Sequence, residues 1–246
     1  MTARLAVITA SAAGIGLAIA RRFVADGWRV VMSDVDAVRG AAEARTLGAE
    51  FRPCDCGDPR QIAALFAGLG TVSLLVNNAG ISGPTLPVAE MPLAEWRRVL
   101  DINLTGQFVA AQQVLPGMIA ARHGVIVNMS SVAGKLGWPN RAPYVASKWA
   151  ILGLTATLAR EVAEHGIRVN AILPGTVRGP RIDRVIRTYA ERDGMTQEQA
   201  ETTLLAHQAT KRFIEPSEIA DTVAFLASDG ACSITGQFIS VDGGFQ

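Results

Sequence analysis

Cysteine and histidine are scarce in this sequence, which has three of each among its 246 residues. An odd and sparse set of cysteines, Cys54, Cys56 and Cys232, does not suit a disulfide framework. The Cys-x-Cys at 54 and 56 would need further ligands to hold a metal ion, and the histidines show no ligand spacing with one another. We therefore expect structural cysteines and no metal site.

The sequence also lacks an excess of charge of either sign and lacks long apolar runs. The chain carries 23 basic and 22 acidic side chains, so its formal net charge of +1 favours neither a nucleic acid nor a membrane surface as partner. No apolar run reaches the roughly 18 residues typical of a membrane span, and the first residues enter a strand pattern without the features of a signal peptide. These absences predict a soluble, cytoplasmic protein, and the length suits one domain spanning residues 1–246.

Short runs rich in Val, Ile and Leu alternate with amphipathic helical patterns along the whole chain. The apolar runs predict strands at residues 4–9, 28–34, 49–55, 72–80, 124–130, 167–173 and 236–244. Helical patterns separate them, including a long one over 92–121, and the charged segment 176–212 has no strand signal. Near-continuous apolar strands between helices are typical of a parallel sheet covered on both faces, so the predicted fold class is α/β.

The first strand leads into a glycine-bearing turn, TASAAGIG at residues 9–16, and then into a helix. A turn of this kind aims the N–H groups of the helix N-terminus at the crevice beyond the strand, which suits a pyrophosphate. Asp34 ends the second strand 20 residues after Gly14, where a carboxylate can accept hydrogen bonds from the ribose hydroxyls of an adenine nucleotide. Asn77, Asn78 and Gly80 close the fourth strand at its carboxyl end, where open α/β sheets hold ligands.

Tyr144 and Lys148 are four residues apart on a helix that is predicted to begin near Pro143, so their side chains lie on one face. A phenol has an ordinary pKa of about 10, and a nearby ammonium group lowers that pKa by favouring the phenolate. The positive end of the helix macrodipole acts in the same direction. With a serine hydroxyl from the end of the strand 124–130 to hold a substrate oxygen, these groups would form an acid/base device for an alcohol or a carbonyl.

The whole chain resembles the short-chain dehydrogenase/reductase family (classical type) over residues 4–244. Several ordered motifs carry the resemblance: TASAAGIG at 9–16, Asp55, NNAG at 77–80, Asn103, a serine 13 residues before Tyr144, Tyr144-x-x-x-Lys148, and Pro174-Gly175. The resemblance implies a Rossmann-type, doubly wound parallel sheet of seven strands with helices on both faces. It also implies reversible hydride transfer between a nicotinamide and a hydroxyl or carbonyl carbon.

The resemblance further implies a role for each site residue. Tyr144 is the acid/base, Lys148 lowers its pKa and holds the nicotinamide ribose, and Ser131 orients the substrate oxygen. Asn103 anchors a water relay behind Lys148. Ser130 and Ser131 point to opposite faces as strand neighbours, and the family spacing selects Ser131. The implied cofactor-binding residues are Ser11, Gly14, Ile15, Gly16, Asp34, Asp55, Asn77, Ala79, Gly80, Tyr144, Lys148, Pro174, Gly175 and Val177.

One position departs from the family pattern, because Ala10 stands where a glycine usually follows the first threonine. If this residue takes a positive φ angle or approaches a phosphate closely, its methyl group adds a steric cost. We expect a slightly altered turn with weaker cofactor affinity rather than a loss of binding.

Asp34 also decides the expected cofactor. Its carboxylate accepts hydrogen bonds from a ribose 2′-hydroxyl but repels a 2′-phosphate, and the flanking Ala13 and Val35 supply no positive charge. The main hypothesis is therefore an NAD-dependent dehydrogenase of a secondary alcohol. The nearest alternative is an NADPH-dependent 3-oxoacyl-thioester reductase, which shares the catalytic residues. An alternative of another class is a nucleotide-sensing protein that has lost the chemistry.

The helix that follows Tyr144 bears on assembly. Its segment 149–159, WAILGLTATLA, is almost wholly apolar, which suggests burial on both sides of the helix and a partner subunit as the cover. Together with the family resemblance, this pattern predicts a homotetramer.

The segment 176–212 corresponds to the mobile lid that the family places over the substrate. Arg178 and Arg181 flank Gly179-Pro180 at its start, nearest the nicotinamide. Paired N–H groups of these arginines would clamp a carboxylate, sulfonate or phosphate, so the predicted substrate is an anionic or strongly polar hydroxy compound. The alternative is a solvated helix face whose arginines are paired with Asp183, Glu191 and Asp193.

Overall fold

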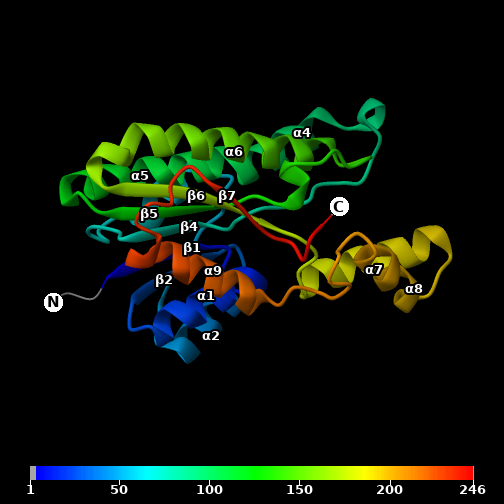
Figure 1. Ribbon diagram of the computed structural model, residues 1–246, viewed down its shortest axis with the longest axis horizontal. Helices are drawn as coiled ribbons and strands as arrows, with labels where there is room; N and C mark the ends of the chain where they lie inside the picture. The colour runs from blue at the N-terminus through cyan, green and yellow to red at the C-terminus, as the bar shows by residue number, and fades with distance from the viewer. Residues whose placement is uncertain (1–3, 246) are drawn as a thin grey trace.

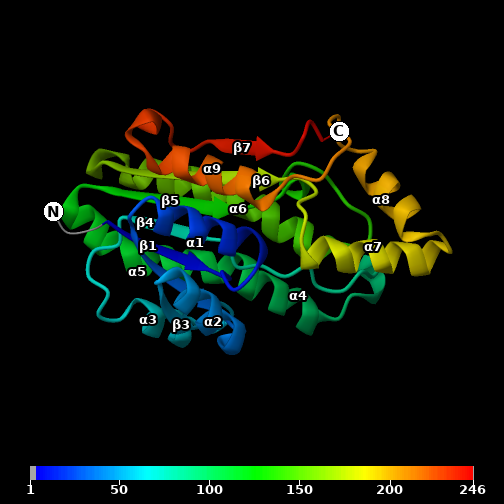
Figure 2. The same ribbon diagram turned by 90° about the horizontal axis from the view of Figure 1, so that it is seen from below.

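The structure, a computed structural model, describes residues 4–245 and is built on one sheet of seven parallel strands. The strands are β1 (Leu5–Thr9), β2 (Arg29–Asp34), β3 (Glu50–Pro53), β4 (Leu74–Asn77), β5 (Gly124–Met129), β6 (Ile167–Pro174) and β7 (Phe238–Val241). Their order is β3-β2-β1-β4-β5-β6-β7, with β3 and β7 at the two edges (Figure 2). The predicted α/β, Rossmann-type doubly wound sheet of seven strands is confirmed.

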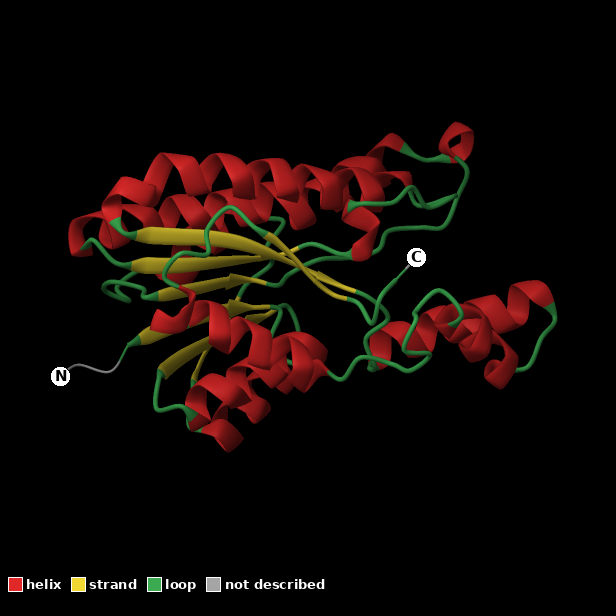
Figure 3. Ribbon diagram, viewed as in Figure 1, coloured by secondary structure: helices red, strands yellow, loops and turns green. Residues whose placement is uncertain are grey.

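Helices cover both faces of this sheet (Figures 1 and 3). One face carries α1 (Gly14–Ala25), α2 (Ala37–Leu47) and α9 (Pro216–Ala227), and the other carries α3 (Pro59–Phe66), α5 (Gly106–Ala121) and α6 (Ala142–Val162). A shorter helix, α4 (Leu93–Leu100), packs against α6. Short 3₁₀ turns occur at Val88–Glu90, Val132–Gly134, Ala163–His165 and Asp229–Ala231. Because the central strands are buried on both faces, their sequences are continuous apolar runs rather than alternating ones.

The long helical pattern over 92–121 is not one regular helix. α4 ends at Leu100, five residues in π-helical geometry follow as η2 (Asp101–Thr105), and α5 then begins. Asn103 lies in this π-helical turn with its side chain fully buried. Its Oδ1 accepts a hydrogen bond from Ile81 N at 2.8 Å, and its Nδ2 donates to Ile81 O and to Ser147 Oγ, both at 3.0 Å. The turn therefore points one amide at both the loop after β4 and the helix α6.

The segment 176–212 contains no strand, as predicted, and folds as α7 (Pro180–Asp193) and α8 (Gln197–Leu205). These helices lie beyond the carboxyl ends of the strands, apart from the two helix layers (Figures 1 and 2). Together with their flanking residues 176–214 they form what we call the α7–α8 lobe. The lobe has its own apolar cluster of Ile186, Ala200, Leu204 and Phe213. Single β-bridges join Val177 to Ile214 and Gln208 to Phe245.

The chain itself buries five of the eleven residues in the apolar run 149–159. Ile151, Leu152 and Leu158 face the sheet and its core. The outward face consists of Trp149, which is 51% exposed, together with the exposed Gly153 and Thr157. The helix is therefore apolar on its sheet side and carries one large apolar ring among small residues on the other side.

Within residues 4–245, no helix combines the length and the apolar composition needed to cross a membrane. In the same range, no cluster of three or more His, Cys, Asp or Glu side chains is placed to hold a metal ion. All three cysteines are free thiols; Cys54 and Cys56 are buried and Cys232 is exposed.

Candidate active site

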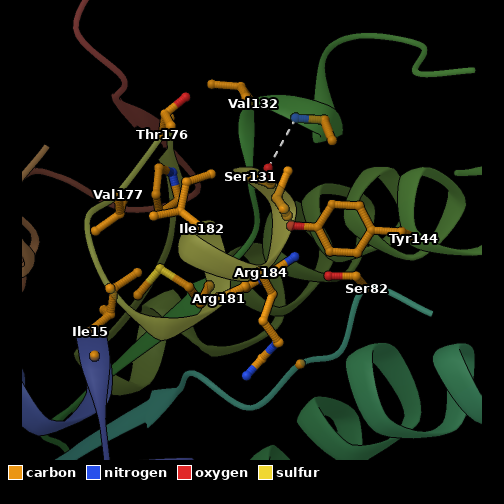
Figure 4. Close-up of a pocket in the computed structure, with 18 of the residues that line it drawn as sticks. Ile15, Ser82, Ser131, Val132, Tyr144, Thr176, Val177, Arg181, Ile182 and Arg184 are labelled. Carbon is orange, nitrogen blue, oxygen red and sulfur yellow. Dashed lines mark hydrogen bonds between the residues drawn. The ribbon is translucent and has the colours of Figure 1, made fainter. Parts of the chain in front are cut away.

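A cavity of about 500 Å³ lies where the turn after β1, the loops after β4, β5 and β6, and the α7–α8 lobe come together (Figure 4). In doubly wound sheets, ligands bind at this edge, outside the carboxyl ends of the strands. Eleven of the sequence-predicted site residues line the cavity: Gly14, Ile15, Gly80, Ser131, Tyr144, Lys148, Pro174, Gly175, Val177, Arg178 and Arg181.

Ser131 and Tyr144 face each other inside the cavity. The Tyr144 hydroxyl points toward Ser131 (Figure 4). Ser131 Oγ accepts a hydrogen bond from Ala133 N at 3.2 Å, which is the dashed line in the figure. The neighbouring Ser130 is buried, and its Oγ donates to Lys148 O at 2.8 Å. The two adjacent hydroxyls therefore have different neighbours. Ser131 faces the phenol of Tyr144 in the cavity, whereas the hydrogen bond of Ser130 holds α6 against the end of β5.

Lys148 lies one helical turn beyond Tyr144 on α6 and is only 3% exposed. Its Nζ donates a hydrogen bond to Met129 O at 2.8 Å and lies 5.6 Å from the centre of the Tyr144 ring. Burial lowers the pKa of Lys148 to about 8, because a poorly solvated site disfavours the ammonium form. Tyr144 opposes this effect and Arg181 adds to it.

The pKa of Tyr144 reflects opposing influences. Burial by itself raises this pKa, but the positive charges of Arg181 and Lys148 and a hydrogen bond with Ser131 favour the phenolate. The net result is a pKa lowered from 10.0 to about 8. The guanidinium carbon of Arg181 lies 4.9 Å from the centre of the Tyr144 ring. The expected influence of Lys148 is present, and the lobe supplies a second positive charge that the Tyr-x-x-x-Lys spacing does not reveal.

Asn103 lies behind the cavity, next to Lys148. A Cβ atom added to Gly80 would sit 3.3 Å from Asn103 Oδ1 and 3.4 Å from Lys148 Nζ. The amide and the ammonium group therefore both lie beside Gly80, where a larger side chain would contact them. Ser147, which accepts from Asn103, in turn donates its hydroxyl to Tyr144 O at 2.7 Å. This chain of contacts ties the loop after β4, the π-helical turn and α6 to one another.

The turn after β1 fits a dinucleotide pyrophosphate. α1 begins at Gly14, and no side chain caps its first turn, so the first N–H groups have no side-chain acceptor. A Cβ atom on Gly16 would lie 2.3 Å from Ala10 O and 2.7 Å from Asn78 Nδ2, so only glycine allows this close packing. A Cβ on Gly14 would meet nothing within 4 Å, which leaves open space in front of the turn.

Ala10 adopts φ 51°, in the left-handed region that glycine tolerates and a Cβ makes costly. The position that departs from the family pattern is therefore one that requires positive φ. The turn is held nonetheless, since Asn78 Nδ2 donates to Ala10 O at 2.9 Å and to Thr9 O at 3.1 Å.

Asp34 ends β2 beside this turn, outside the lining of the cavity. Its Oδ2 accepts a hydrogen bond from Ala12 N at 2.9 Å, and its Oδ1 accepts one from Asp36 N at 3.0 Å. These bonds hold the carboxylate in place and leave its negative charge unneutralised, because both donors are backbone N–H groups.

Five other expected cofactor residues also lie outside the lining: Ser11, Gly16, Asp55, Asn77 and Ala79. The fully buried Ser11 accepts a hydrogen bond on its Oγ from Ser33 N at 3.0 Å, which joins β1 to β2. The exposed Asp55 accepts from Gly57 N at 2.8 Å, within its own loop. The structure thus gives Ser11 and Asp55 contacts that shape the edge of the sheet.

The two adjacent amides of the NNAG motif are separated by the fold. Asn77 is buried, and its Nδ2 donates to Asn128 Oδ1 at 2.9 Å inside the core. Asn78, not Asn77, reaches the cavity. Neighbouring side chains on a strand point to opposite faces of the sheet, and this alternation is the sequence signal that distinguishes Asn77 from Asn78.

The structure also separates the two arginines of the predicted clamp. Arg178 lies over the Phe213 ring, with its guanidinium carbon 4.6 Å from the ring centre, and its Nε donates to Glu215 Oε1 at 3.0 Å. Arg178 is thus paired, although with Glu215 rather than with Asp183, Glu191 or Asp193. Arg181 instead lies against Tyr144. The cavity contains three further arginines that sequence reasoning did not single out as ligands: Arg39, Arg141 and Arg184.

Comparison with known proteins agrees with this geometry. The family described as Enoyl-(Acyl carrier protein) reductase matches residues 9–246. The chain belongs to the short-chain dehydrogenase/reductase family. Within this family it is 36% identical to the D-beta-hydroxybutyrate dehydrogenase of Rhizobium meliloti, with 98% of each chain covered. It is 39% identical to the 3-oxoacyl-(acyl-carrier-protein) reductase FabG of Staphylococcus epidermidis, with 97% of each chain covered.

A solved structure extends the likeness to three dimensions. A variant of the actinorhodin polyketide ketoreductase with NADPH matches at a TM-score of 0.94 and 37% identity, covering 98% of this chain and 97% of that one. This short-chain dehydrogenase/reductase is accordingly a hydride-transfer oxidoreductase. The alternative of a nucleotide-sensing protein without chemistry gains no support from these relatives.

Proposed function

We propose that this protein transfers a hydride between NAD and a secondary alcohol or ketone through Ser131, Tyr144, Lys148 and Asn103. The observation that carries the proposal is the phenol of Tyr144, directed at Ser131 in the cavity with its pKa lowered to about 8. At that pKa both the phenol and the phenolate are populated near neutral pH. One group therefore serves as base when an alcohol is oxidised and as acid when a ketone is reduced.

Each residue then has a defined task in alcohol oxidation. Ser131 Oγ holds the substrate oxygen, and the Tyr144 phenolate takes the proton of the substrate hydroxyl. Lys148 and Arg181 stabilise the phenolate by their charges. A bound nicotinamide supplies the acceptor for the hydride.

The residues available to hold the cofactor come from both ends of the cavity. The uncapped start of α1 at Gly14 and Ile15 would bind the pyrophosphate, and Lys148 would hold the nicotinamide ribose. Pro174, Gly175 and Val177 line the cavity at the end of β6, where they would contact the nicotinamide. Asn103, bonded to Ser147 beside Lys148, would anchor the water that returns the proton to solvent.

The proposed preference for NAD rests on Asp34. Its carboxylate is held beside the nucleotide turn by two backbone N–H groups and would repel a 2′-phosphate. Arg39, from α2, also lines the cavity and would attract a 2′-phosphate. This arginine and the ketoreductase relatives favour, as a second candidate, an NADPH-dependent reductase of 3-oxoacyl thioesters.

Initial rates measured by absorbance at 340 nm distinguish the two candidates. A panel of hydroxy compounds, ketones and 3-oxoacyl thioesters is assayed with each cofactor. We expect a higher kcat/KM with NAD than with NADP, and a smaller difference in Asp34→Asn. Asp36→Asn, which keeps a helix-capping side chain nearby, serves as the matched control. A higher kcat/KM for NADPH with the thioesters would replace the first candidate by the second.

We also infer that four copies assemble. Phe108 on α5 and Trp149 on α6 are 43% and 51% exposed on one side of the sheet, and Phe225 on α9 and Phe238 on β7 are 49% and 38% exposed elsewhere. Two separate self-complementary surfaces are what a tetramer with twofold symmetry axes requires. A monomer mass in light scattering would contradict the homotetramer.

We place the protein in the cytoplasm, which its free thiols support.

A further inference from the structure

Two guanidinium groups reach the cavity beside Tyr144 from separate parts of the chain. Arg141 is the N-cap residue of α6, three residues before Tyr144. Arg181 is the second residue of α7, in the α7–α8 lobe. Both line the cavity. The guanidinium carbon of Arg181 lies 4.9 Å from the centre of the Tyr144 ring, and Figure 4 labels both residues. The charges are therefore placed at the reacting end of the cavity, with the acid/base itself.

Neither of these groups has a carboxylate partner. Across residues 4–245, no Asp or Glu oxygen lies within 4.0 Å of the Arg141 or Arg181 guanidinium. Arg178, only three residues before Arg181, is paired with Glu215 at 3.0 Å. The fold therefore neutralises the arginine at the edge of the cavity and leaves the two beside Tyr144 without an acid.

The lining of the cavity as a whole carries charge of one sign. It includes no acidic side chain, and its basic ones are Arg39, Arg141, Lys148, Arg178, Arg181 and Arg184. Burial, followed by the charge of Arg181, lowers the pKa of Arg141, so its charged form is disfavoured where it lies. An anion bound beside Arg141 would favour that charged form.

The geometry of arginine restricts the kind of anion. Each guanidinium presents its N–H groups as a planar fork that matches two oxygens of one oxyanion. The lobe also contributes apolar side chains to the lining, among them Ile182, Val185 and Leu204. A ligand with a carboxylate or sulfonate at one end and a short hydrocarbon body matches both parts of the lining.

We propose that Arg141 and Arg181 form an oxyanion clamp for the carboxylate or sulfonate of a short hydroxy acid or its oxo counterpart. The proposal rests on the hydride-transfer function above and moves the predicted clamp from Arg178 to Arg141. The clamp holds the acid group while the alcohol oxygen meets Ser131 and Tyr144. The alcohol carbon gives a hydride to NAD⁺ and its hydroxyl gives a proton to Tyr144, which yields the oxo acid, NADH and one proton. The clamp itself makes and breaks no covalent bond.

Unreactive anions test the clamp without turnover. Butyrate, butanesulfonate and the neutral butyramide are titrated by calorimetry into enzyme saturated with NADH. We expect at least one of the two anions, butyrate or butanesulfonate, to bind at least about tenfold more tightly than butyramide, because hydrogen bonds to charged groups are stronger than those to neutral groups. Arg141→Gln and Arg181→Gln should each weaken anion binding about 10- to 100-fold.

The matched control is Arg187→Gln, on the same helix as Arg181 but outside the cavity lining. It should leave anion binding unchanged. The affinity for NADH should also be unchanged in Arg141→Gln and Arg181→Gln. Equal binding of butyrate, butanesulfonate and butyramide would overturn the clamp. A loss of NADH affinity that accounts for the loss of anion affinity would overturn it too, since the arginines would then serve the cofactor phosphates.

Turnover distinguishes failure of the clamp from failure of the proposed function. The readout is the ratio of kcat/KM for 3-hydroxybutyrate to kcat/KM for its methyl ester. The ratio should fall about 10- to 100-fold in Arg141→Gln and partly recover in Arg141→Lys, which keeps the charge and loses the fork. If wild-type enzyme oxidises acid and ester equally, the clamp is wrong and hydride transfer stands. If neither is oxidised with either cofactor while butyrate binding still depends on Arg141, the clamp stands and the proposed function fails.

Discussion

The sheet and the α7–α8 lobe both line the cavity, but they differ in how their polar and charged side chains are held. Behind the sheet side, buried polar groups satisfy one another: Asn77 donates to Asn128, and Asn128 donates to Thr155 Oγ1, both at 2.9 Å. The lobe has only a small apolar cluster and places its charged side chains at the surface. Satisfied buried networks hold a fixed geometry, whereas a lobe with few connections opens at a lower free energy. Tyr144 and Lys148 therefore lie on the more rigid side, whereas Arg181, whose charge lowers the pKa of Tyr144, lies on the lobe.

One buried side chain joins the two regions. Gln208 is fully buried; its Oε1 accepts from Thr176 N, where the chain enters the lobe, and its Nε2 donates to Arg212 O, where the chain leaves, both at 2.5 Å. A Cβ atom on Gly175 would lie 2.8 Å from Gln208 Oε1. Gly175 thus allows the close approach of this amide, which holds both connections of the lobe.

The largest expected effect comes from the sheet side alone. Tyr144→Phe keeps the ring and removes the ionisable hydroxyl, so kcat should fall about 100-fold or more while NADH affinity persists. Absorbance at 340 nm and a fluorescence titration with NADH measure the two quantities. Tyr189→Phe, the same change at the other tyrosine of the cavity, is the control and should keep its turnover. Unchanged kcat in Tyr144→Phe would remove Tyr144 from the mechanism.

The pH dependence of the rate tests whether the lobe adjusts the sheet side. Alcohol oxidation needs the Tyr144 phenolate, so its rate should rise with pH through about 8, whereas ketone reduction needs the phenol and should fall over the same range. Arg181 lowers this pKa, so Arg181→Gln should move both profiles to higher pH. Below the pKa, each unit of upward shift lowers the phenolate fraction about tenfold. Profiles recorded with an uncharged alcohol exclude effects of the oxyanion clamp, and identical profiles for both enzymes would show that Arg181 has no such influence.

Removing the Gln208 amide, which connects the lobe to the sheet, should have a smaller effect. Gln208→Leu leaves Thr176 N–H and Arg212 C=O without their partner, at a cost of about 1–3 kcal/mol for each group that stays buried. The lobe can relieve this cost by opening, so hydrogen exchange should accelerate in residues 176–214 and not in the strands. We expect kcat/KM to fall up to about tenfold, since 1.4 kcal/mol corresponds to a factor of ten. Gln237→Leu, outside the lobe, controls for the loss of an amide. Equal rates of hydrogen exchange in the mutant and the wild type would mean that Gln208 does not hold the lobe to the sheet.

The smallest effect is expected in the nucleotide turn. Ala10→Gly removes the cost of φ 51° at a residue with a Cβ, and part of this gain is lost because glycine makes the unfolded chain more flexible. The free energy of unfolding should rise by about 0.5–1 kcal/mol, which corresponds to a Tm increase of about 1–4 °C for a chain of this size. Scanning calorimetry measures the change. Ala13→Gly, at a residue with φ −155°, should give no such gain. A lower Tm in Ala10→Gly would show that the turn is not strained.

Several site features could be predicted because they depend on local periodicity. Tyr144 and Lys148 share a face because four residues make about one helical turn, and the apolar runs became strands because both faces of the sheet are covered. Other features depend on partners far along the chain. Arg178 is paired with Glu215, 37 residues away, and the amide of Asn103 bonds the backbone of Ile81 from a π-helical turn inside an unbroken helical pattern.

The sequence by itself determined the succession of strands and helices along the chain and the shared helix face of Tyr144 and Lys148, since spacing along the backbone specifies which side chains share a face. The choice of Ser131 over Ser130 came from the family resemblance. Only the tertiary structure decided which arginines meet an acid and which meet Tyr144. It also decided that Ala10 must take a positive φ angle. Charge pairing and backbone strain arise from contacts between segments distant in the chain, and no local pattern of residue types records those contacts.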